Sequence, residues 1–178
     1  MRKLFLLFLI LFVCSCADHN DYTQVKVKEV IDGDTVILEN GEMLRYLGID
    51  TPEVRVREGG DFQYLPQPFS LEAKRYNEEV AEGRYIRVEF DVQRRDRYGR
   101  LLGYCFAKDV FINAKMVEEG FAVIYTRPPN LKYAEHLLGL QRKARAENKG
   151  LWGVYPPISP VEAAGFINQI RSVRGEVK

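Results

Sequence analysis

The first part of the chain alternates apolar and polar residues with the two-residue period of β-strands. Three segments have this pattern: residues 24–30, 35–38 and 43–49. The motifs Asp32-Gly33-Asp34 and Asn40-Gly41 separate them, and such motifs are typical of tight hairpin turns. We therefore expect an antiparallel meander of three strands. In the first strand, Val25, Val27 and Glu29 are expected to lie on one face.

The rest of the chain combines helical and strand patterns. Val54 to Pro68 has no apolar periodicity and is expected to be a long loop. Ser70 is placed to cap the helix that follows it. Further segments are expected as helices at 71–82, 113–120 and 131–148, and as strands at 85–90 and 101–107. A meander, a helix and two more strands predict an α+β domain, compatible with a five-stranded OB-fold-type β-barrel with about three helices.

The chain end is predicted to form a separate extension. In Ser159-Pro160-Val161-Glu162, serine followed by glutamate three residues later resembles a capping box. We expect a short terminal helix to about Val173. The predicted organisation is a signal peptide at 1–16, a tether at 17–23, the folded domain at 24–153 and a C-terminal extension at 154–178.

The N-terminus has the features of a targeting segment. Arg2 and Lys3 precede an apolar run from Leu4 to Val13, which is shorter than the roughly 20 residues that span a bilayer. The motif Val13-Cys14-Ser15-Cys16 resembles a lipoprotein box with Cys16 as the lipidated residue. Cleavage after Ala17 is the alternative. The protein is accordingly expected in the cell envelope, lipid-anchored at the membrane, or else secreted.

The charge and the cysteine and histidine content limit the kinds of binding and catalytic site that the chain can form. The formal net charge is +1, so any anion-binding site must come from local clustering, as at Arg94, Arg95, Arg97 and Arg100. Cys105 is the only cysteine outside the leader and is expected to be a buried strand thiol. No spacing of cysteine and histidine suits zinc. His136 lies in a predicted helix, which disfavours a histidine general base.

Oxygen ligands for a hard cation come from two places in the predicted meander. Asp34 begins the second strand, and Asp50 with Thr51 ends the third, so the three residues are expected to lie near each other. Carboxylates, backbone carbonyls and water are the ligands of such cations. Each aspartate alone is equally typical of an ordinary turn.

Three further residues have side chains that could take part in phosphodiester hydrolysis. Glu53 follows Pro52 and could activate a water molecule beside the cation. Arg45 lies on an apolar-leaning strand face, where a charged group needs a partner or a ligand. A guanidinium group can bind two phosphate oxygens at once, and Arg100 could supply a second one. Taken singly, Glu53 and Arg100 also fit ordinary surface residues.

Together these motifs resemble the staphylococcal nuclease family over about Val25 to Trp152. The resemblance rests on four blocks in order: residues 30–35, Arg45, residues 49–53 and residues 96–100. It implies that Asp34, Asp50 and the carbonyl of Thr51 bind Ca²⁺. It implies that Glu53 is the general base or positions water, and that Arg45 and Arg100 hold the scissile phosphate.

The resemblance also implies a nucleotide-binding region, where this chain departs from the family. Arg97 and Tyr98 match positions that contact a nucleotide phosphate, and Tyr125 matches one of two tyrosines lining a base pocket. Arg127 stands where the second tyrosine is expected, and arginine can stack or bind phosphate. The segment Val54 to Pro68 is longer than in the founding member, and the part after Trp152 has no counterpart in the core domain.

The implied activity is Ca²⁺-dependent hydrolysis of DNA and RNA with little sequence specificity, preferring single strands. The products would carry 3′-phosphates and 5′-hydroxyls, and the family is usually monomeric. The alternative is a catalytically inactive nuclease-like module that binds nucleic acid. Such modules typically lose several of the five matched side chains, whereas this chain keeps all five.

Overall fold

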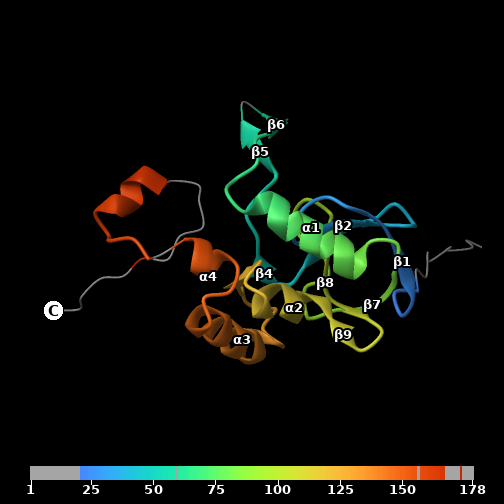
Figure 1. The fold of residues 1–178 in the computed structure, drawn as a ribbon. Coiled ribbons are helices and arrows are strands. Elements are labelled where there is room, and N and C mark those ends of the chain that lie inside the picture. Colours follow the sequence, from blue (N-terminus) through green and yellow to red (C-terminus); the bar gives the residue numbers. More distant parts are fainter. Residues whose placement is uncertain (1–20, 59, 156, 167–172, 174–178) are drawn as a thin grey trace, which may run out of the picture.

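A computed structural model describes residues 21–58, 60–155, 157–166 and 173 of the chain. The residues of the predicted targeting segment, including Cys16, lie outside these ranges. Within them, five strands close into a barrel against which three main helices pack (Figure 1). The expected α+β barrel of the OB type is confirmed.

The barrel is closed by one parallel pairing. β1 (Val25–Val30), β2 (Thr35–Leu38) and β3 (Met43–Tyr46) form the expected antiparallel meander, and β7 (Tyr85–Glu89) and β8 (Leu101–Ala107) continue the sheet from β1. β8 then pairs in parallel with β3, with Leu44 opposite Leu101. Because this pairing joins the two ends of the sheet, the end of β3 lies beside the start of β8. The short β9 (Val110–Phe111) extends β8 outward.

The predicted third strand is broken near its end. β3 stops at Tyr46, and β4 (Gly48–Asp50) pairs instead with β10 (Val123–Tyr125). Gly48 has a φ of 81°, a left-handed conformation that favours glycine, and a Cβ there would lie 2.7 Å from the Leu137 side chain. The chain therefore leaves the barrel wall at this corner, which carries Asp50 outward.

Two local predictions are wrong. The register of β1 shifts between Val27 and Glu29, so Val30 is buried and Glu29 is exposed. Such a bulge inserts a residue and reverses the alternation beyond it. Ser70 does not cap α1 (Ser70–Ala81): it is the first helical residue, Phe69 precedes it with a φ of 72°, and the buried Ser70 hydroxyl has no hydrogen-bond partner among the described residues.

The segment expected to be a loop contains a hairpin. β5 (Arg55–Glu58) and β6 (Asp61–Tyr64) pair antiparallel and project from the body of the protein (Figure 1). The sequence signal was present, because Gly59-Gly60 separates two runs with β-branched and aromatic residues. Charged residues in both runs mask the apolar period.

Three helices pack around the barrel. α1 contacts β1, α2 (Ile112–Glu118) contacts β8 and α1, and α3 (Ala134–Ala146) contacts α2 and β10. Their buried side chains complete one core with the inward residues of the strands, including Val27, Leu38, Leu44, Ile86, Met116 and Leu137. Cys105 belongs to this core as expected, and burial raises the pKa of its thiol.

The C-terminal segment follows α4 (Leu151–Val154) and lies beside the barrel domain in Figure 1. A 3₁₀ helix, η1 (Glu162–Phe166), begins there. The N–H of Glu162 donates to the Ser159 hydroxyl, and the N–H of Ser159 donates to the Glu162 carboxylate, so the predicted capping box is present. Of the expected helix to Val173, residues 167–172 lie outside the described part.

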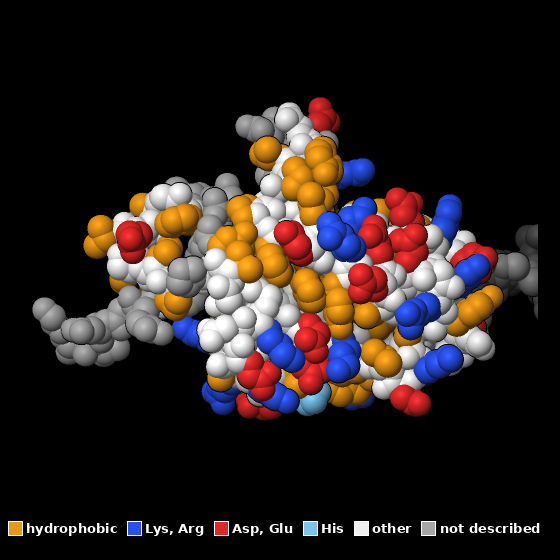
Figure 2. Space-filling model, in the orientation of Figure 1, with side chains coloured by type: hydrophobic (Ala, Val, Ile, Leu, Met, Phe, Trp, Pro, Cys, Tyr) orange, Lys and Arg blue, Asp and Glu red, His pale blue; other side chains and the backbone are white. Residues whose placement is uncertain are grey.

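Within the described ranges, no helix is both long and apolar enough to cross a membrane. On the face shown in Figure 2, basic and acidic side chains are intermixed, in keeping with the small net charge. This face therefore carries no broad basic surface.

Candidate active site

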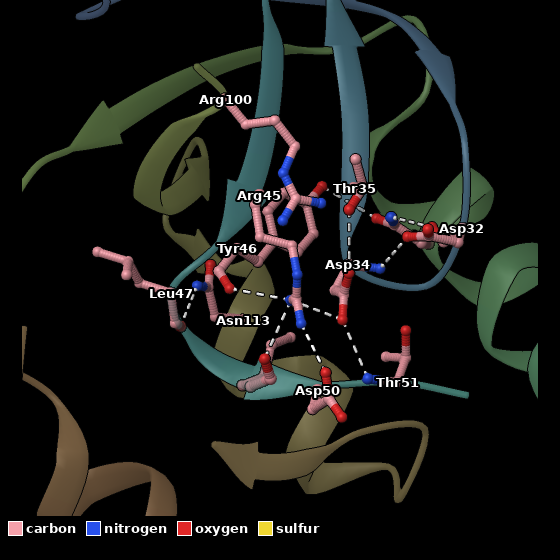
Figure 3. A network of polar contacts seen from close by, with 12 residues as sticks. Asp32, Asp34, Thr35, Arg45, Tyr46, Leu47, Asp50, Thr51, Arg100 and Asn113 are labelled. Atoms are coloured by element: carbon pink, nitrogen blue, oxygen red, sulfur yellow. Dashed lines mark hydrogen bonds and ion pairs between the residues drawn. The ribbon is translucent and has the colours of Figure 1, made fainter. Parts of the chain in front are cut away.

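A largely buried arginine joins two of the predicted site carboxylates (Figure 3). Arg45 of β3 forms ion pairs with Asp34 through Nη1 at 2.6 Å and with Asp50 through Nη2 at 2.7 Å. Its Nη1 also donates to the carbonyl of Ile49 at 3.0 Å. The side chain of Arg45 is 13% exposed and that of Asp34 only 1%. The charged residue on the strand face thus has partners within the protein.

The start of β2 and the end of β4 are in direct contact. The N–H of Thr51 donates to Oδ2 of Asp34 at 3.0 Å, and the hydroxyl of Thr35 donates to Oδ1 of the same carboxylate at 3.1 Å. A Cβ at position 33 would lie 2.7 Å from the Thr51 side chain, so only glycine fits there. The predicted proximity of Asp34, Asp50 and Thr51 is therefore present.

Two helices fix the backbone around this cluster. Asn77 of α1 donates to the carbonyl of Asp32 and accepts a hydrogen bond from the Tyr46 hydroxyl. Asn113 of α2 donates to the carbonyl of Leu47 at 2.8 Å and accepts from the N–H of Cys105. Both asparagines are fully buried, so these bonds are shielded from competition with water.

Burial raises the pKa values of three carboxylates in the cluster, and repulsion between neighbouring acids adds to the effect. Burial, followed by weaker repulsion from neighbouring acids, raises the pKa of Asp34 well above its usual value despite the attraction of Arg45. Burial also raises the pKa of Asp50. For Glu53, burial and then the charge of Asp32 raise the pKa from 4.5 to about 7. Four acidic groups thus share one buried guanidinium, and negative charge is in excess.

Several polar atoms at the cluster have no partner within the described part of the chain. Among the described residues, nothing donates to the carboxylate of Glu53 or to Oδ2 of Asp50. Arg45 has five N–H donors, of which Nε and one hydrogen of Nη2 are unused by the described part of the chain. The site therefore has both acceptors and donors available for ligands.

A cavity of about 490 Å³ adjoins the cluster. Its lining includes six of the residues singled out from the sequence: Arg45, Arg97, Tyr98, Arg100, Tyr125 and Arg127. They come from β3, the β7–β8 loop, β10 and the segment after β10, so the fold gathers residues up to 82 positions apart, the separation of 45 and 127. The charge of Arg100 also acts on Glu53, which links the cavity to the acidic cluster.

Asp96 organises the loop that carries the cationic residues. Its carboxylate accepts hydrogen bonds from the N–H groups of Tyr98 and Arg100 and from Nε of Arg100 at 2.7 Å. The Nη groups of Arg100 have no hydrogen-bond or ion-pair partner within the described residues. The Arg97 guanidinium stacks on the Tyr98 ring, 4.8 Å from its centroid. The loop therefore aims one guanidinium into the cavity and holds a second at its wall.

Asn130 connects the opposite wall of the cavity, which contains Arg127, to this loop by hydrogen bonds. It is 5% exposed, and its side-chain amide exchanges two hydrogen bonds of 2.8 Å with the backbone of Gln93. Arg127 and Tyr125 lie on the exposed rim, where the described structure gives Arg127 no side-chain partner. The cavity is thus cationic on both walls.

The donor set fits a hard divalent cation better than zinc. No three or more Asp, Glu, His or Cys side chains in the described ranges are close enough to form a complete cage. Two carboxylates and backbone carbonyls are present, and Ca²⁺ commonly completes such a shell with water. Burial raises the pKa values of Asp34, Asp50 and Glu53, with smaller contributions from repulsion between neighbouring acids, which a bound cation would offset.

Sequence reasoning missed several residues of this region. Asp32 was assigned only to a turn, although it is 9% exposed and its charge acts on Asp34, Asp50 and Glu53. Its place two residues before Asp34 was a usable signal. Gln67, which contacts Glu53, and Asn130 were also missed, and no local pattern distinguishes them from loop residues.

The geometry defines a class of protein: an OB-type α+β barrel with a guanidinium-lined cavity beside an acidic cluster. A family model described as staphylococcal nuclease homologue matches residues 43–154. A thermonuclease of Staphylococcus hyicus is 35% identical over 130 residues, covering 71% of this chain and 74% of that protein. The chain belongs to the staphylococcal nuclease family, which confirms the resemblance found in the sequence.

Other relatives include nucleases of different genera. A thermonuclease of Staphylococcus intermedius is 33% identical over 71% of this chain and 74% of its own length. Endonuclease YncB of Bacillus subtilis is 32% identical over 72% of this chain and 61% of its own length. These relatives support assignment of the chain to the nucleases.

The raised pKa of Glu53 predicts a pH-dependent gain in stability when its charge is removed. Because the folded protein holds the Glu53 proton up to about pH 7, whereas the unfolded chain releases it near 4.5, ionisation destabilises the fold above that interval. Glu53→Gln should raise the free energy of unfolding at pH 8 by about 1–2 kcal/mol, since the carboxylate keeps some solvent contact, and by much less at pH 5. Urea unfolding with chelator measures this.

The matched control is Glu39→Gln, which neutralises an exposed glutamate in the β2–β3 turn and should change little at either pH. Equal effects of Glu53→Gln at pH 5 and pH 8 would show that the charge of Glu53 is not destabilising.

Proposed function

We propose that the chain is a Ca²⁺-dependent endonuclease that hydrolyses phosphodiester bonds of DNA and RNA with little sequence specificity. The observation that carries this proposal is the juxtaposition of a guanidinium-lined cavity with a carboxylate, Glu53, that has no partner in the described protein. Hydrolysis of a phosphodiester requires cationic donors for the developing charge and a base for the attacking water.

Arg45 and Arg100 are proposed to hold the scissile phosphate. Both line the cavity, and both keep N–H donors that no described residue uses. A guanidinium group can donate to two phosphate oxygens at once, and its bonds strengthen as negative charge grows on those oxygens. Because Arg45 and Arg100 are fixed by Asp34 and Asp96, little reorganisation is needed during the reaction.

Glu53 is proposed to act on the attacking water. Its carboxylate takes a proton as the water oxygen bonds to phosphorus, and the bond from phosphorus to the 5′-oxygen breaks. The leaving 5′-oxygen then takes a proton from solvent. The products are a 3′-phosphate and a 5′-hydroxyl. Burial with other acids raises the pKa of Glu53 to about 7, which suits a general base near neutral pH.

Asp34, Asp50 and the carbonyl of Thr51 are proposed to hold Ca²⁺, because the cluster has excess negative charge and oxygen ligands only. When bound, the ion supplies Lewis-acid polarisation of a phosphoryl oxygen. Asp32 adds to the negative potential from close by.

The remaining cavity residues are proposed to bind the neighbouring nucleotide. Arg97, Tyr98 and Arg127 can contact phosphates, and Tyr125 can stack on a base. Since bases must be unstacked to reach such a pocket, single strands are the proposed preferred substrate. The proposed form is a monomer.

Cleavage of a labelled single-stranded DNA oligonucleotide tests this proposal. With Ca²⁺ the protein should cut it, and with chelator it should not. Arg100→Ala and Asp50→Asn should each lower the rate by about 10²-fold or more. Arg100→Ala removes a charge contact to the phosphate in the transition state, and Asp50→Asn removes a charged ligand of the proposed cation. Asp109→Asn is the control, because it neutralises an exposed carboxylate in the turn before β9.

The chemical ends of the products and the affinity for the oligonucleotide distinguish an active nuclease from an inactive binding module. Labelling should detect 3′-phosphate and 5′-hydroxyl ends. Oligonucleotide binding without cleavage under every condition would indicate the inactive binding module instead. Cleavage that persists with chelator would exclude the proposed metal requirement.

We also propose that the protein is anchored in the cell envelope by lipid on Cys16, with secretion after cleavage at Ala17 as the alternative. The support is the apolar run and the lipoprotein-like motif of the first 17 residues. Cys16→Ser should shift the protein from the membrane fraction to the soluble fraction, measured by fractionation and immunoblotting. His19→Gln, in the expected tether outside this motif, is the control and should remain in the membrane fraction. An unchanged distribution for Cys16→Ser would favour secretion without an anchor.

A further inference from the structure

The backbone of Glu53 is held on both sides by a single residue, Gln67. The N–H of Glu53 donates to Oε1 of Gln67 at 2.8 Å, and the N–H of Gln67 donates to the carbonyl of Glu53 at 2.9 Å. Gln67 thus uses its side-chain oxygen and its own main chain on the two polar groups of one residue.

This pair of bonds closes the base of the projecting hairpin. β5 begins at Arg55, two residues after Glu53, and β6 ends at Tyr64, three residues before Gln67. Figure 1 shows the hairpin standing away from the barrel, so its packing gives little support to the chain at its base. The Gln67 bonds therefore help to fix the path of the backbone where the hairpin leaves the site.

Fixing that backbone matters because the carboxylate of Glu53 is not fixed at its own end. No described residue donates to the Glu53 carboxylate. Its position therefore depends on the direction of the bond from Cα to Cβ, which the backbone sets, and on side-chain rotamers. Pro52 and Val54 on either side are buried, which limits backbone rotation at those two residues. The amide of Glu53 itself is held by its hydrogen bond to Gln67.

We propose that Gln67 is a positioning residue for Glu53, holding the backbone so that the carboxylate faces the scissile phosphate. This inference rests on the proposed function, since it needs Glu53 to act on the attacking water. Gln67 acts through Glu53 and does not line the guanidinium-rich cavity. Its loss should consequently lower kcat and leave substrate binding nearly unchanged.

Two substitutions of Gln67 distinguish a role in positioning Glu53 from a general effect of changing the side chain. Gln67→Met keeps the length of the side chain but removes the oxygen that accepts the Glu53 N–H. Gln67→Glu keeps an acceptor oxygen in the same place. Gln67→Met should lower kcat about 10- to 100-fold, on the scale expected for misplacing a catalytic group by about 1 Å. Gln67→Glu should recover most of that loss, and KM should stay within about two-fold in both.

The control is Asn40→Ala, which removes the same kind of bond, from the N–H of Glu42 to a side-chain oxygen, in the turn between β2 and β3. It should leave kcat and KM unchanged. Circular dichroism and Tm of each variant establish that it is folded. If Gln67→Met does not fold, Gln67→Ala takes its place in the same comparison.

A double substitution distinguishes the two proposals. In a Glu53→Gln background, Gln67→Met should change kcat less than about two-fold, because its effect passes through Glu53. If Glu53→Gln alone keeps wild-type kcat, the proposed function of Glu53 is wrong. If Glu53→Gln is slow but Gln67→Met keeps wild-type kcat, or slows both backgrounds equally, only the positioning role is wrong. The role is also wrong if Gln67→Glu recovers nothing.

Discussion

The site depends on the ion pairs that the buried Arg45 forms with Asp34 and Asp50. A carboxylate as enclosed as Asp34 is costly without a partner, and removal of one member of such a pair leaves an uncompensated charge. Arg45 compensates part of the acidic cluster, but Asp32 and Glu53 leave negative charge in excess. On the other side of Arg45 the cavity is cationic. One residue therefore lies at the boundary between a region suited to a cation and a region suited to a phosphate.

The barrel makes this boundary possible through the pairing that closes it. Because β3 and β8 run in parallel, Arg45 and the start of β8 after Arg100 lie side by side. The corner at Gly48 turns β4 out of the wall and onto β10, which adds Asp50 and Tyr125 to the same region. Buried asparagines of α1 and α2 hold these segments by their backbones. The rigid elements thus place a site whose own residues lie mainly in turns and loops.

Much of this arrangement could be predicted from the sequence, because it follows local rules. Strict alternation and turn motifs located β2 and β8 to the residue, and the four motif blocks indicated the family. The bulge of β1 could not be predicted, since it arises from pairing with β2. The β5–β6 hairpin was missed because charged residues obscure its period. The contacts of Gln67 and Asn130 join segments 14 and 37 residues apart, a separation that no local pattern reveals.

If the acidic cluster and the cationic cavity act as one site through Arg45, binding of a cation and binding of a phosphate are coupled. Calorimetric titration of Ca²⁺, with and without a saturating nucleoside 3′,5′-bisphosphate, tests this coupling most directly. Ca²⁺ at Asp34 and Asp50 should offset the carboxylate charge beside Arg45 and so strengthen its attraction for phosphate. Each ligand should therefore tighten the other by about ten-fold, within the usual range for coupled sites. Equal Ca²⁺ affinities with and without the bisphosphate would contradict the account.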